Sequence, residues 1–160
     1  MTPAANNTPD TILVLDFGSQ YAQLIARRVR EAGAFSLLVS PGESVERLRA
    51  MKPKGIILSG GPASVSDKGV PTCDKAIFEL GVPVLGICYG MQLGCSLLGS
   101  RVDKAPAREY GRTRLDVKQA DGLMKNIASP TTVWMSHGDQ VADLSKDFEI
   151  LASTPSCPYA

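Results

Sequence analysis

The sequence predicts an open α/β fold in which a mostly parallel sheet is flanked by helices. The first observation is that four runs in the N-terminal half are apolar at nearly every position, which indicates strands covered on both faces. The second is that segments with apolar residues at helical spacing separate these runs, so that strands and helices alternate. The third is that shorter β segments joined by loops follow in the C-terminal third, beyond Gly99. The four apolar runs lie at 11–17, 36–40, 55–59 and 82–87.

The first two helices lie between the first three apolar runs. Residues 20–32 repeat apolar side chains at helical spacing, and Gly33 stands where the end of a helix favours a positive φ. Residues 44–52 form the second helix, with Ser44 as its N-cap. Each crossover of this kind is right-handed, so consecutive strands run parallel.

The remaining elements follow in order. A loop at 60–72 precedes a short helix at 73–80, and a helix at 89–98 follows the fourth apolar run. Ligands of parallel α/β sheets bind outside the carboxyl ends of the strands, so the residues that follow each run are candidates for a site. In the C-terminal third we expect strands at 109–119, 131–136 and 148–154.

Composition and charge exclude several classes of function. The chain has 160 residues, enough for one domain, which we expect at 11–160 after a disordered tail at 1–10 rich in Pro, Asn and Thr. Its 17 Lys and Arg against 16 Asp and Glu give a formal charge of +1, which argues against nucleic-acid binding. The N-terminus does not resemble a signal peptide and no apolar run is long enough to span a membrane, so we expect a cytoplasmic protein.

A structural metal is not expected. The four cysteines form no Cys-x-x-Cys pair, and the single histidine cannot complete the usual zinc spacings. We therefore expect no metal, and separately we predict no cofactor in this domain.

Cys88 stands at the centre of a Gly-x-Cys-x-Gly sequence that directly follows the fourth apolar run. This spacing is typical of a nucleophile elbow, a sharp turn from strand to helix that holds the nucleophile in a strained conformation at the start of the helix. The N-terminus of a helix lowers the pKa of a thiol and so favours the thiolate. The alternative is a buried packing cysteine, which is how we interpret the other three: Cys73, Cys95 and Cys157.

A glycine-rich segment follows the third apolar run, at the same edge of the predicted sheet. Backbone N–H groups of Gly60 and Gly61 are unobstructed donors, and one of them, with the Tyr89 N–H, could stabilise an oxyanion. The alternative is a simple turn. Ser59 to Ser64 resemble the phosphate loop of ATP pyrophosphatases, but Ala63 replaces its carboxylate, which argues against nucleotide binding there.

His137 is the only histidine and therefore the only candidate for a histidine base within the chain. Pairing it with Cys88 is one interpretation. A loop histidine bonded to backbone is the other, because Ser-His-Gly-Asp is a loop-forming sequence. The residues alone do not decide between them.

Five motifs together resemble the class I, or triad-type, glutamine amidotransferases, and among them the amidotransferase domain of the GMP synthase family. The resemblance covers about residues 11 to 154 and implies the flavodoxin-like or Rossmann-like fold of that class. The cysteine and Gly-Gly-Pro motifs mark the class, whereas the first and last motifs point to GMP synthases, hence to GMP and purine biosynthesis and a ligase. The motifs are Leu-Asp-Phe-Gly-Ser-Gln-Tyr (15–21), Leu-Ser-Gly-Gly-Pro (58–62), Gly-Ile-Cys-Tyr-Gly-Met-Gln (86–92), Arg-Glu-Tyr-Gly (108–111) and Trp-Met-Ser-His-Gly-Asp (134–139).

The resemblance implies a role for each matched residue. Cys88 would attack the side-chain amide of glutamine, giving a glutamyl thioester and ammonia, and the N–H groups of Gly61 and Tyr89 would form the oxyanion hole. Gly60 would bind substrate, and Gln92 with the backbone of a loop at 136–139 would hold the α-amino and α-carboxyl groups of glutamine. The loop residues are Ser136, His137, Gly138 and Asp139.

The resemblance also implies parts that these 160 residues lack. The base of the family is a histidine in a Phe-His-Pro-Glu type motif, oriented by the glutamate, and we expect that pair beyond residue 160 in a chain truncated at its C-terminus. His137 is then not the base, and the chain alone is expected to be nearly inactive. The partner that aminates XMP to GMP would be an ATP pyrophosphatase (synthetase) domain, which uses ATP and Mg²⁺. It would lie in the same chain or in a partner protein. The missing regions could also mediate oligomerisation.

Three other functions remain open from the sequence. One is a non-catalytic amidotransferase-like binding module, although such a module has no physical need of a strained elbow. Another is an amidotransferase that supplies ammonia for anthranilate, CTP or carbamoyl phosphate. The third is a cysteine hydrolase acting on an unrelated class of substrate with a different base.

Overall fold

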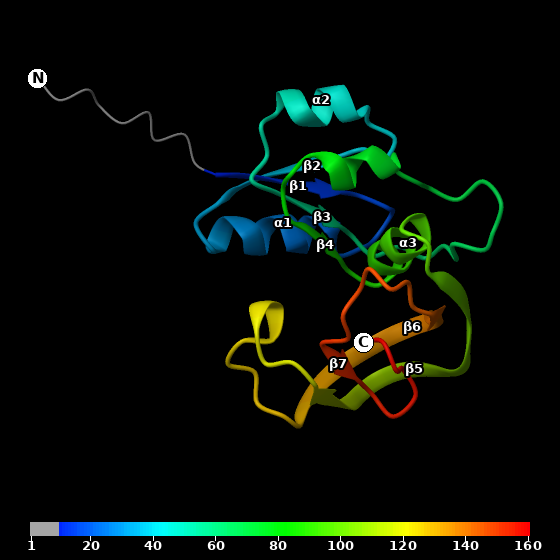
Figure 1. Cartoon of the computed structure of the whole chain (residues 1–160). Coiled ribbons are helices and arrows are strands. Elements are labelled where there is room, and N and C mark those ends of the chain that lie inside the picture. Colours follow the sequence, from blue (N-terminus) through cyan, green and yellow to red (C-terminus); the bar gives the residue numbers. More distant parts are fainter. Residues whose placement is uncertain (1–9) are drawn as a thin grey trace, which may run out of the picture. The chain divides into compact units, whose positions relative to one another are not determined.

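The computed structural model describes residues 10–160, except for the side chains of residues 106 and 107. The expected disordered tail at 1–10 lies, apart from Asp10, outside the described residues. The chain forms two compact units (Figure 1). Of the described residues, the first holds 10–63 together with 69–91, and the second holds 64–68 together with 92–160.

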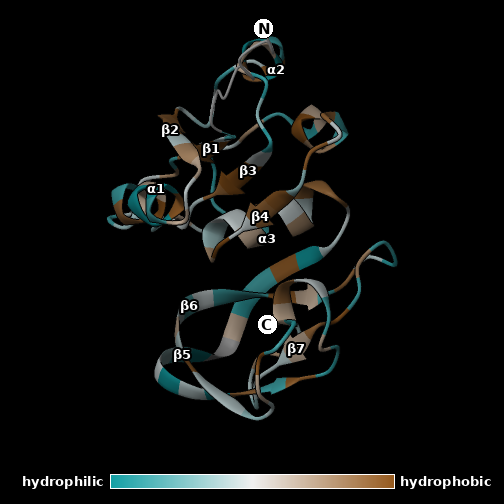
Figure 2. Ribbon diagram, turned by 90° about the vertical axis from the view of Figure 1, so that its left-hand side faces the viewer, coloured by the Kyte–Doolittle hydropathy of each residue, from teal (hydrophilic) through white to brown (hydrophobic). Residues whose placement is uncertain are grey.

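The sheet of the first unit is parallel throughout, which confirms the predicted class. Its order is β2-β1-β3-β4, and Leu15 of β1 pairs with Leu58 of β3, which pairs with Gly86 of β4. The strands β1 and β3 carry buried aliphatic side chains at Leu13, Val14, Leu15, Ile56 and Leu58, and both strands are brown in Figure 2. The strands are β1 (Thr11–Leu15), β2 (Phe35–Val39), β3 (Gly55–Leu58) and β4 (Val84–Gly86).

The helices of this unit end and begin where their sequences predict. The hydroxyl of Ser44 accepts from the Arg47 N–H at 3.3 Å and caps α2, and Gly33 has φ +89° just beyond α1. The segment expected as a helix at 73–80 is shorter, a 3₁₀ helix after Asp74, whose side chain accepts from the Ala76 N–H. The elements are α1 (Ala22–Glu31), α2 (Val45–Ala50), η1 (Lys75–Glu79) and α3 (Tyr89–Leu97), of which only residues 89–91 belong to this unit.

The strand order places a topological switch point at the carboxyl ends of β1 and β3. Because β2 and β3 lie on opposite sides of β1, right-handed crossovers put α1 and α2 on opposite faces of the sheet, as Figure 2 shows. Open α/β sheets bind ligands where the connections of adjacent strands depart in opposite directions. The segments after β1 and β3 meet there.

The second unit is an antiparallel sheet in the order β6-β5-β7. Its first strand begins at Arg101 rather than at 109, because 101–108 combines charged residues with a proline and so carries no clear strand pattern. Only two residues of the expected strand at 148–154 pair, as β7. The elements are β5 (Arg101–Val117), η2 (Gly122–Met124), β6 (Thr131–Asp143) and β7 (Ala152–Ser153).

The expected loop at 136–139 is wrong: these residues lie within β6. Ser-His-Gly-Asp has a loop-forming composition, but pairing with β5 keeps it extended. The register shifts twice, between Arg101 and Val102 and again between Lys104 opposite Asp139 and Glu109 opposite His137. At the second shift β5 bulges where β6 passes through Gly138.

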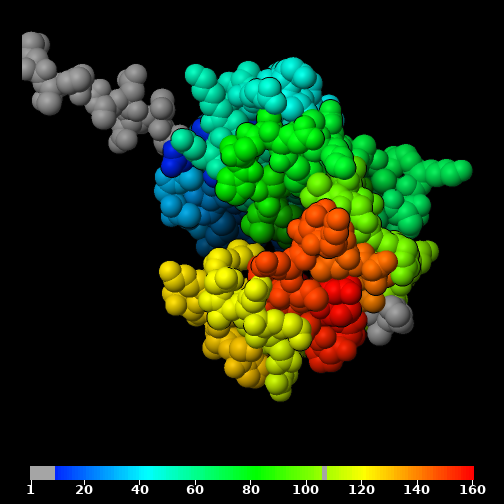
Figure 3. All heavy atoms as spheres, viewed as in Figure 1, coloured from blue at the N-terminus to red at the C-terminus, as the bar shows by residue number. Residues whose placement is uncertain are grey.

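One face of the β5–β6 pair is exposed and carries two aromatic side chains. Trp134 is 75% exposed and Tyr110 is 65% exposed, whereas Glu109 and Leu115 on the other face are buried. Figure 3 shows the red C-terminal residues beside the orange residues that include the end of β6.

Within residues 10–160, no helix has the length and apolar character needed to cross a membrane.

Candidate active site

Cys88 occupies the turn between β4 and α3 in a conformation that few non-glycine residues adopt. Its φ is +51°, in the left-handed region, and its side chain is half-buried. A non-glycine residue held in this region costs of order 1–3 kcal/mol, so the surrounding turn must impose it. The strained elbow predicted from Gly-x-Cys-x-Gly is confirmed.

The two glycines of the elbow are needed because backbone passes close to both. A Cβ on Gly86 would lie 2.5 Å from the Met91 Cα, and a Cβ on Gly90 would overlap the carbonyl oxygen of Leu58. The first turn of α3 therefore packs against the ends of β3 and β4 more tightly than any side chain would allow.

The Gly60–Gly61 segment runs beside this turn. A Cβ built on Gly60 would meet the Cys88 Cβ at 3.6 Å, and one on Gly61 would lie 2.6 Å from the Phe17 carbonyl oxygen. The Gly60–Gly61 segment therefore packs against the backbone that follows β1 at Gly61 and against Cys88 at Gly60.

Ser59 fixes the orientation of the loop. Its side chain is fully buried, accepts from the Phe17 N–H at 3.0 Å and donates to the Gly60 carbonyl at 3.0 Å. Because the C=O and N–H of a trans peptide point in opposite directions, the Gly61 N–H is turned away from Ser59. The sequence did not identify Ser59 as a determinant of this geometry, although it directly precedes the two glycines.

Tyr89 anchors the start of α3. Its ring is buried, with its centroid 5.4 Å from that of Phe17, and its hydroxyl donates to the Pro71 carbonyl at 2.5 Å. Burial raises the pKa of this phenol. The backbone N–H of Tyr89 belongs to the first turn of a helix, whose N–H groups have no partner within the helix.

The other three cysteines are packing residues, as predicted. Cys73, Cys95 and Cys157 are buried thiols. Burial, with the nearby Asp74 carboxylate, raises the pKa of Cys73 to about 11, and burial also raises the pKa of Cys95 and Cys157. Each of these thiols therefore stays protonated at neutral pH.

Gln92 and His137 of the second unit converge on one carbonyl. Gln92 is buried, and its side-chain amide donates to the Asp139 carbonyl at 2.8 Å. The His137 Nδ1 lies 2.9 Å from the same oxygen. A carbonyl only accepts hydrogen bonds, so Nδ1 carries a proton.

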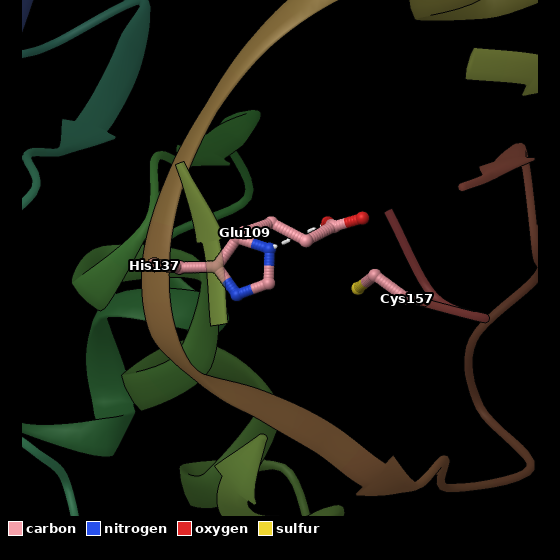
Figure 4. Close-up of side chains that lie close together, drawn as sticks. All are labelled: Glu109, His137 and Cys157. Carbon is pink, nitrogen blue, oxygen red and sulfur yellow. Dashed lines mark hydrogen bonds and ion pairs between the residues drawn. The ribbon is translucent and has the colours of Figure 1, made fainter. Parts of the chain in front are cut away.

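The opposite ring nitrogen of His137 is also engaged. Its Nε2 lies 2.9 Å from Oε2 of Glu109, with both side chains nearly buried (Figure 4). Glu109 Oε1 accepts from the hydroxyls of Thr154, at 2.6 Å, and Ser156. Burial alone would raise the pKa of Glu109, but the hydrogen bonds from Ser156, Thr154 and His137 together lower it.

Glu109, His137 and Cys157 also present three potential metal-ligand atoms within 4.8 Å of one another. Figure 4 shows the three side chains pointing toward one another from β5, β6 and the C-terminal segment. Hydrogen bonds already engage the carboxylate and both ring nitrogens, and the Cys157 thiol lies 3.4 Å from the Tyr159 carbonyl. The expectation of no metal in this domain stays a prediction.

The predicted site residues fall into two groups, one in each compact unit. Sequence analysis did not assign a role to Glu109, although it lies in the Arg-Glu-Tyr-Gly motif. The roles predicted for both groups remain predictions. The first group is Gly60, Gly61, Cys88 and Tyr89, and the second is Gln92, Ser136, His137, Gly138 and Asp139.

Comparison with known proteins gives the family. The family model for class-I glutamine amidotransferases matches residues 13–159. The "GMP synthase [glutamine-hydrolyzing]" of Caldanaerobacter subterraneus is 55% identical over 151 residues, which are 94% of this chain and 30% of that protein. The protein of the same name from Synechocystis sp. is 54% identical over 149 residues, 93% of this chain and 28% of that protein. The chain thus spans under a third of the length of these relatives.

Solved structures agree. A putative GMP synthase subunit from Thermoplasma acidophilum superimposes with a TM-score of 0.82 at 28% identity, covering 94% of this chain and 76% of that one. A glutamine amidotransferase from Thermotoga maritima, 20% identical, shares the fold with a TM-score of 0.74 over 92% of this chain and 68% of its own. The chain belongs to the class-I glutamine amidotransferase family.

Proposed function

We propose that this chain is the glutamine-hydrolysing part of a GMP synthase and that Cys88 is its nucleophile. The thiolate of Cys88 attacks the side-chain amide carbon of glutamine, the C–N bond breaks, and ammonia leaves with a proton from a general acid. Water then hydrolyses the glutamyl thioester to glutamate and restores the thiol. The observation that carries this proposal is the left-handed conformation of Cys88 between Gly86 and Gly90 at the start of α3.

The N–H groups of Gly61 and Tyr89 serve as the oxyanion hole of this reaction. Ser59 turns the Gly61 N–H away from its own side chain, and the Tyr89 N–H belongs to the first turn of α3, whose N–H groups have no partner within the helix. Both belong to the same unit as Cys88. Loss of one such donor costs about 10²–10³ in rate.

Gly60, Gln92 and the strand segment 136–139 bind glutamine in this proposal. The resemblance to the family assigns the α-amino and α-carboxyl groups to Gln92 and the backbone of 136–139. Gln92 and His137 both bond the Asp139 carbonyl, and these two hydrogen bonds hold the segment in one conformation, which supports its proposed role in binding.

The general base comes from outside these 160 residues. The only histidine of the chain has both ring nitrogens engaged, with Glu109 and with the Asp139 carbonyl. We propose that a histidine and glutamate of the longer protein supply this function, and that its ATP- and Mg²⁺-dependent synthetase part uses the ammonia to convert XMP to GMP in the cytoplasm. No cofactor is proposed for the part described here.

Labelling of the longer protein, which supplies the base in this proposal, with the glutamine analogue 6-diazo-5-oxo-L-norleucine tests the proposal. The thiolate of Cys88 displaces N₂ from the protonated diazo carbon and forms a stable thioether that mass spectrometry locates. We expect modification at Cys88, none in Cys88→Ala, and wild-type behaviour in the matched control Cys95→Ala. Absence of specific labelling at Cys88 would favour a non-catalytic module, and labelling that glutamine does not suppress would favour an unrelated cysteine hydrolase.

A further inference from the structure

Glu109 lies at the centre of a hydrogen-bond network that reaches the segment proposed to hold glutamine. We propose that Glu109 is a positioning residue for glutamine: through His137 it fixes the Asp139 carbonyl, and with it the backbone of 136–139. This inference rests on the proposed function.

The carboxylate of Glu109 is almost completely buried, and side chains engage both of its oxygens. Its exposed fraction is 7%, and it joins three segments of the second unit. Oε1 accepts from Thr154 and Ser156 of the C-terminal segment, and Oε2 faces His137 of β6. A buried carboxylate with this many charge-assisted hydrogen bonds holds its partners in defined positions.

His137 transmits that constraint to the backbone. Nδ1 donates to the Asp139 carbonyl, so a lone pair on Nε2 would face an ionised carboxylate across 2.9 Å, which is repulsive. One proton therefore lies between Nε2 and Glu109, and the ring is held at both ends. Without Glu109 the ring keeps one hydrogen bond and can rotate.

The β5–β6 ladder does not supply this constraint at Gly138. The pairing of β5 with β6 is interrupted between Lys104 opposite Asp139 and Glu109 opposite His137, which leaves Gly138 at the break. At an interrupted ladder the backbone lacks its regular partners. Side-chain hydrogen bonds from His137 and Gln92 to the Asp139 carbonyl take their place.

The distinguishing measurement is the concentration dependence of Cys88 labelling by 6-diazo-5-oxo-L-norleucine, set against labelling by iodoacetamide. The first reagent must be recognised as glutamine, whereas the second reports only the reactivity of the thiol. We expect Glu109→Ala to raise the half-saturating concentration of the analogue about tenfold, with the iodoacetamide rate within about twofold of wild type. The matched control is the exposed Glu149→Ala, which is expected to leave both unchanged.

Rescue and coupling distinguish positioning from a general loss of structure. In Glu109→Gln the amide oxygen can accept from Thr154 and Ser156, and the amide N–H can donate to Nε2 of His137. We therefore expect the half-saturating concentration of the analogue to stay within about threefold of wild type. In a His137→Ala background, Glu109→Ala should raise the half-saturating concentration of the analogue by less than about twofold, because Glu109 acts through the His137 ring. Equal effects in both backgrounds would overturn the inference.

The outcomes separate this inference from the proposed function. If wild-type Cys88 shows no saturable labelling, the proposed function fails. If it does and Glu109→Ala matches it, only the role of Glu109 fails. Should Glu109→Ala not fold, as judged by circular dichroism, Ser156→Ala removes one donor to the carboxylate, with an expected rise in half-saturation of two- to threefold; no rise would contradict the inference.

Discussion

The Nε2 of His137 lies 2.9 Å from the Oε2 of Glu109, and with the contact of Nδ1 both ring nitrogens of the only histidine of the chain are engaged. The ring is held on its other side by the Asp139 carbonyl. A cysteine nucleophile needs a base to form the thiolate and an acid to protonate the leaving amine. We expect His137 to do neither.

We therefore predict that these 160 residues alone release ammonia from glutamine at a negligible rate. The measurement is glutamate formation over hours with Cys88→Ala as the blank. His137→Gln should be no slower than wild type. Turnover at an ordinary enzymatic rate, lost in His137→Gln, would instead make His137 the base.

The glycines of the elbow should be intolerant of a methyl group. Gly90→Ala places a Cβ against the Leu58 carbonyl, and we expect it to lower the free energy of unfolding by about 1–3 kcal/mol and to slow labelling of Cys88. Gly42→Ala is the matched control, because nothing lies within 4 Å of its Cβ. Urea denaturation measures both. Equal stability of the two variants would show that the turn is not tightly packed.

The stabilisation from Glu109 should depend on pH. A carboxyl whose pKa is lowered by folding stabilises the fold above its unfolded-state pKa, about 4.3 for glutamate, and this is lost as pH falls through the lower folded-state pKa. We expect Glu109→Gln to be less stable than wild type at neutral pH, with the difference shrinking as the pH falls below about 4. Urea denaturation across this pH range measures it. A difference that does not change with pH would contradict the lowered pKa.

The four cysteines should differ in reactivity toward a thiol reagent in the native protein. The pKa of Cys73 is raised to about 11, and burial also raises the pKa of Cys95 and Cys157. These three side chains therefore stay in the unreactive thiol form and are also shielded from the reagent. We expect one fast phase with Ellman's reagent, assigned to Cys88 by its loss in Cys88→Ala. Retention of the fast phase in that variant would assign it to another cysteine.

The sequence predicted the first unit more completely than the second. In the parallel sheet, continuous apolar runs, the N-cap Ser44 and Gly33 are local signals, and they locate the elements and the elbow at Cys88. The second unit depends on pairing that no local signal encodes. The charged residues and proline of 101–108 hide the start of β5, and Ser-His-Gly-Asp is extended only because β5 lies beside it.

The same distinction applies to the site. Cys88 and the glycines around it were predicted because their spacing reflects local sterics. The partnership of Glu109 with His137, Thr154 and Ser156 joins residues far apart in sequence, and no period or motif indicates it. Glu109 could be suspected only from its place in Arg-Glu-Tyr-Gly.

The most direct test is protection of Cys88 by the substrate. Glutamine is added at increasing concentration during labelling with 6-diazo-5-oxo-L-norleucine, and the modified fraction of Cys88 is read by mass spectrometry. We predict that L-glutamine suppresses the modification in a saturable manner and that D-glutamine does not. Modification that is unaffected by L-glutamine, or that occurs at another cysteine, would contradict the assignment of Cys88 as the glutamine nucleophile.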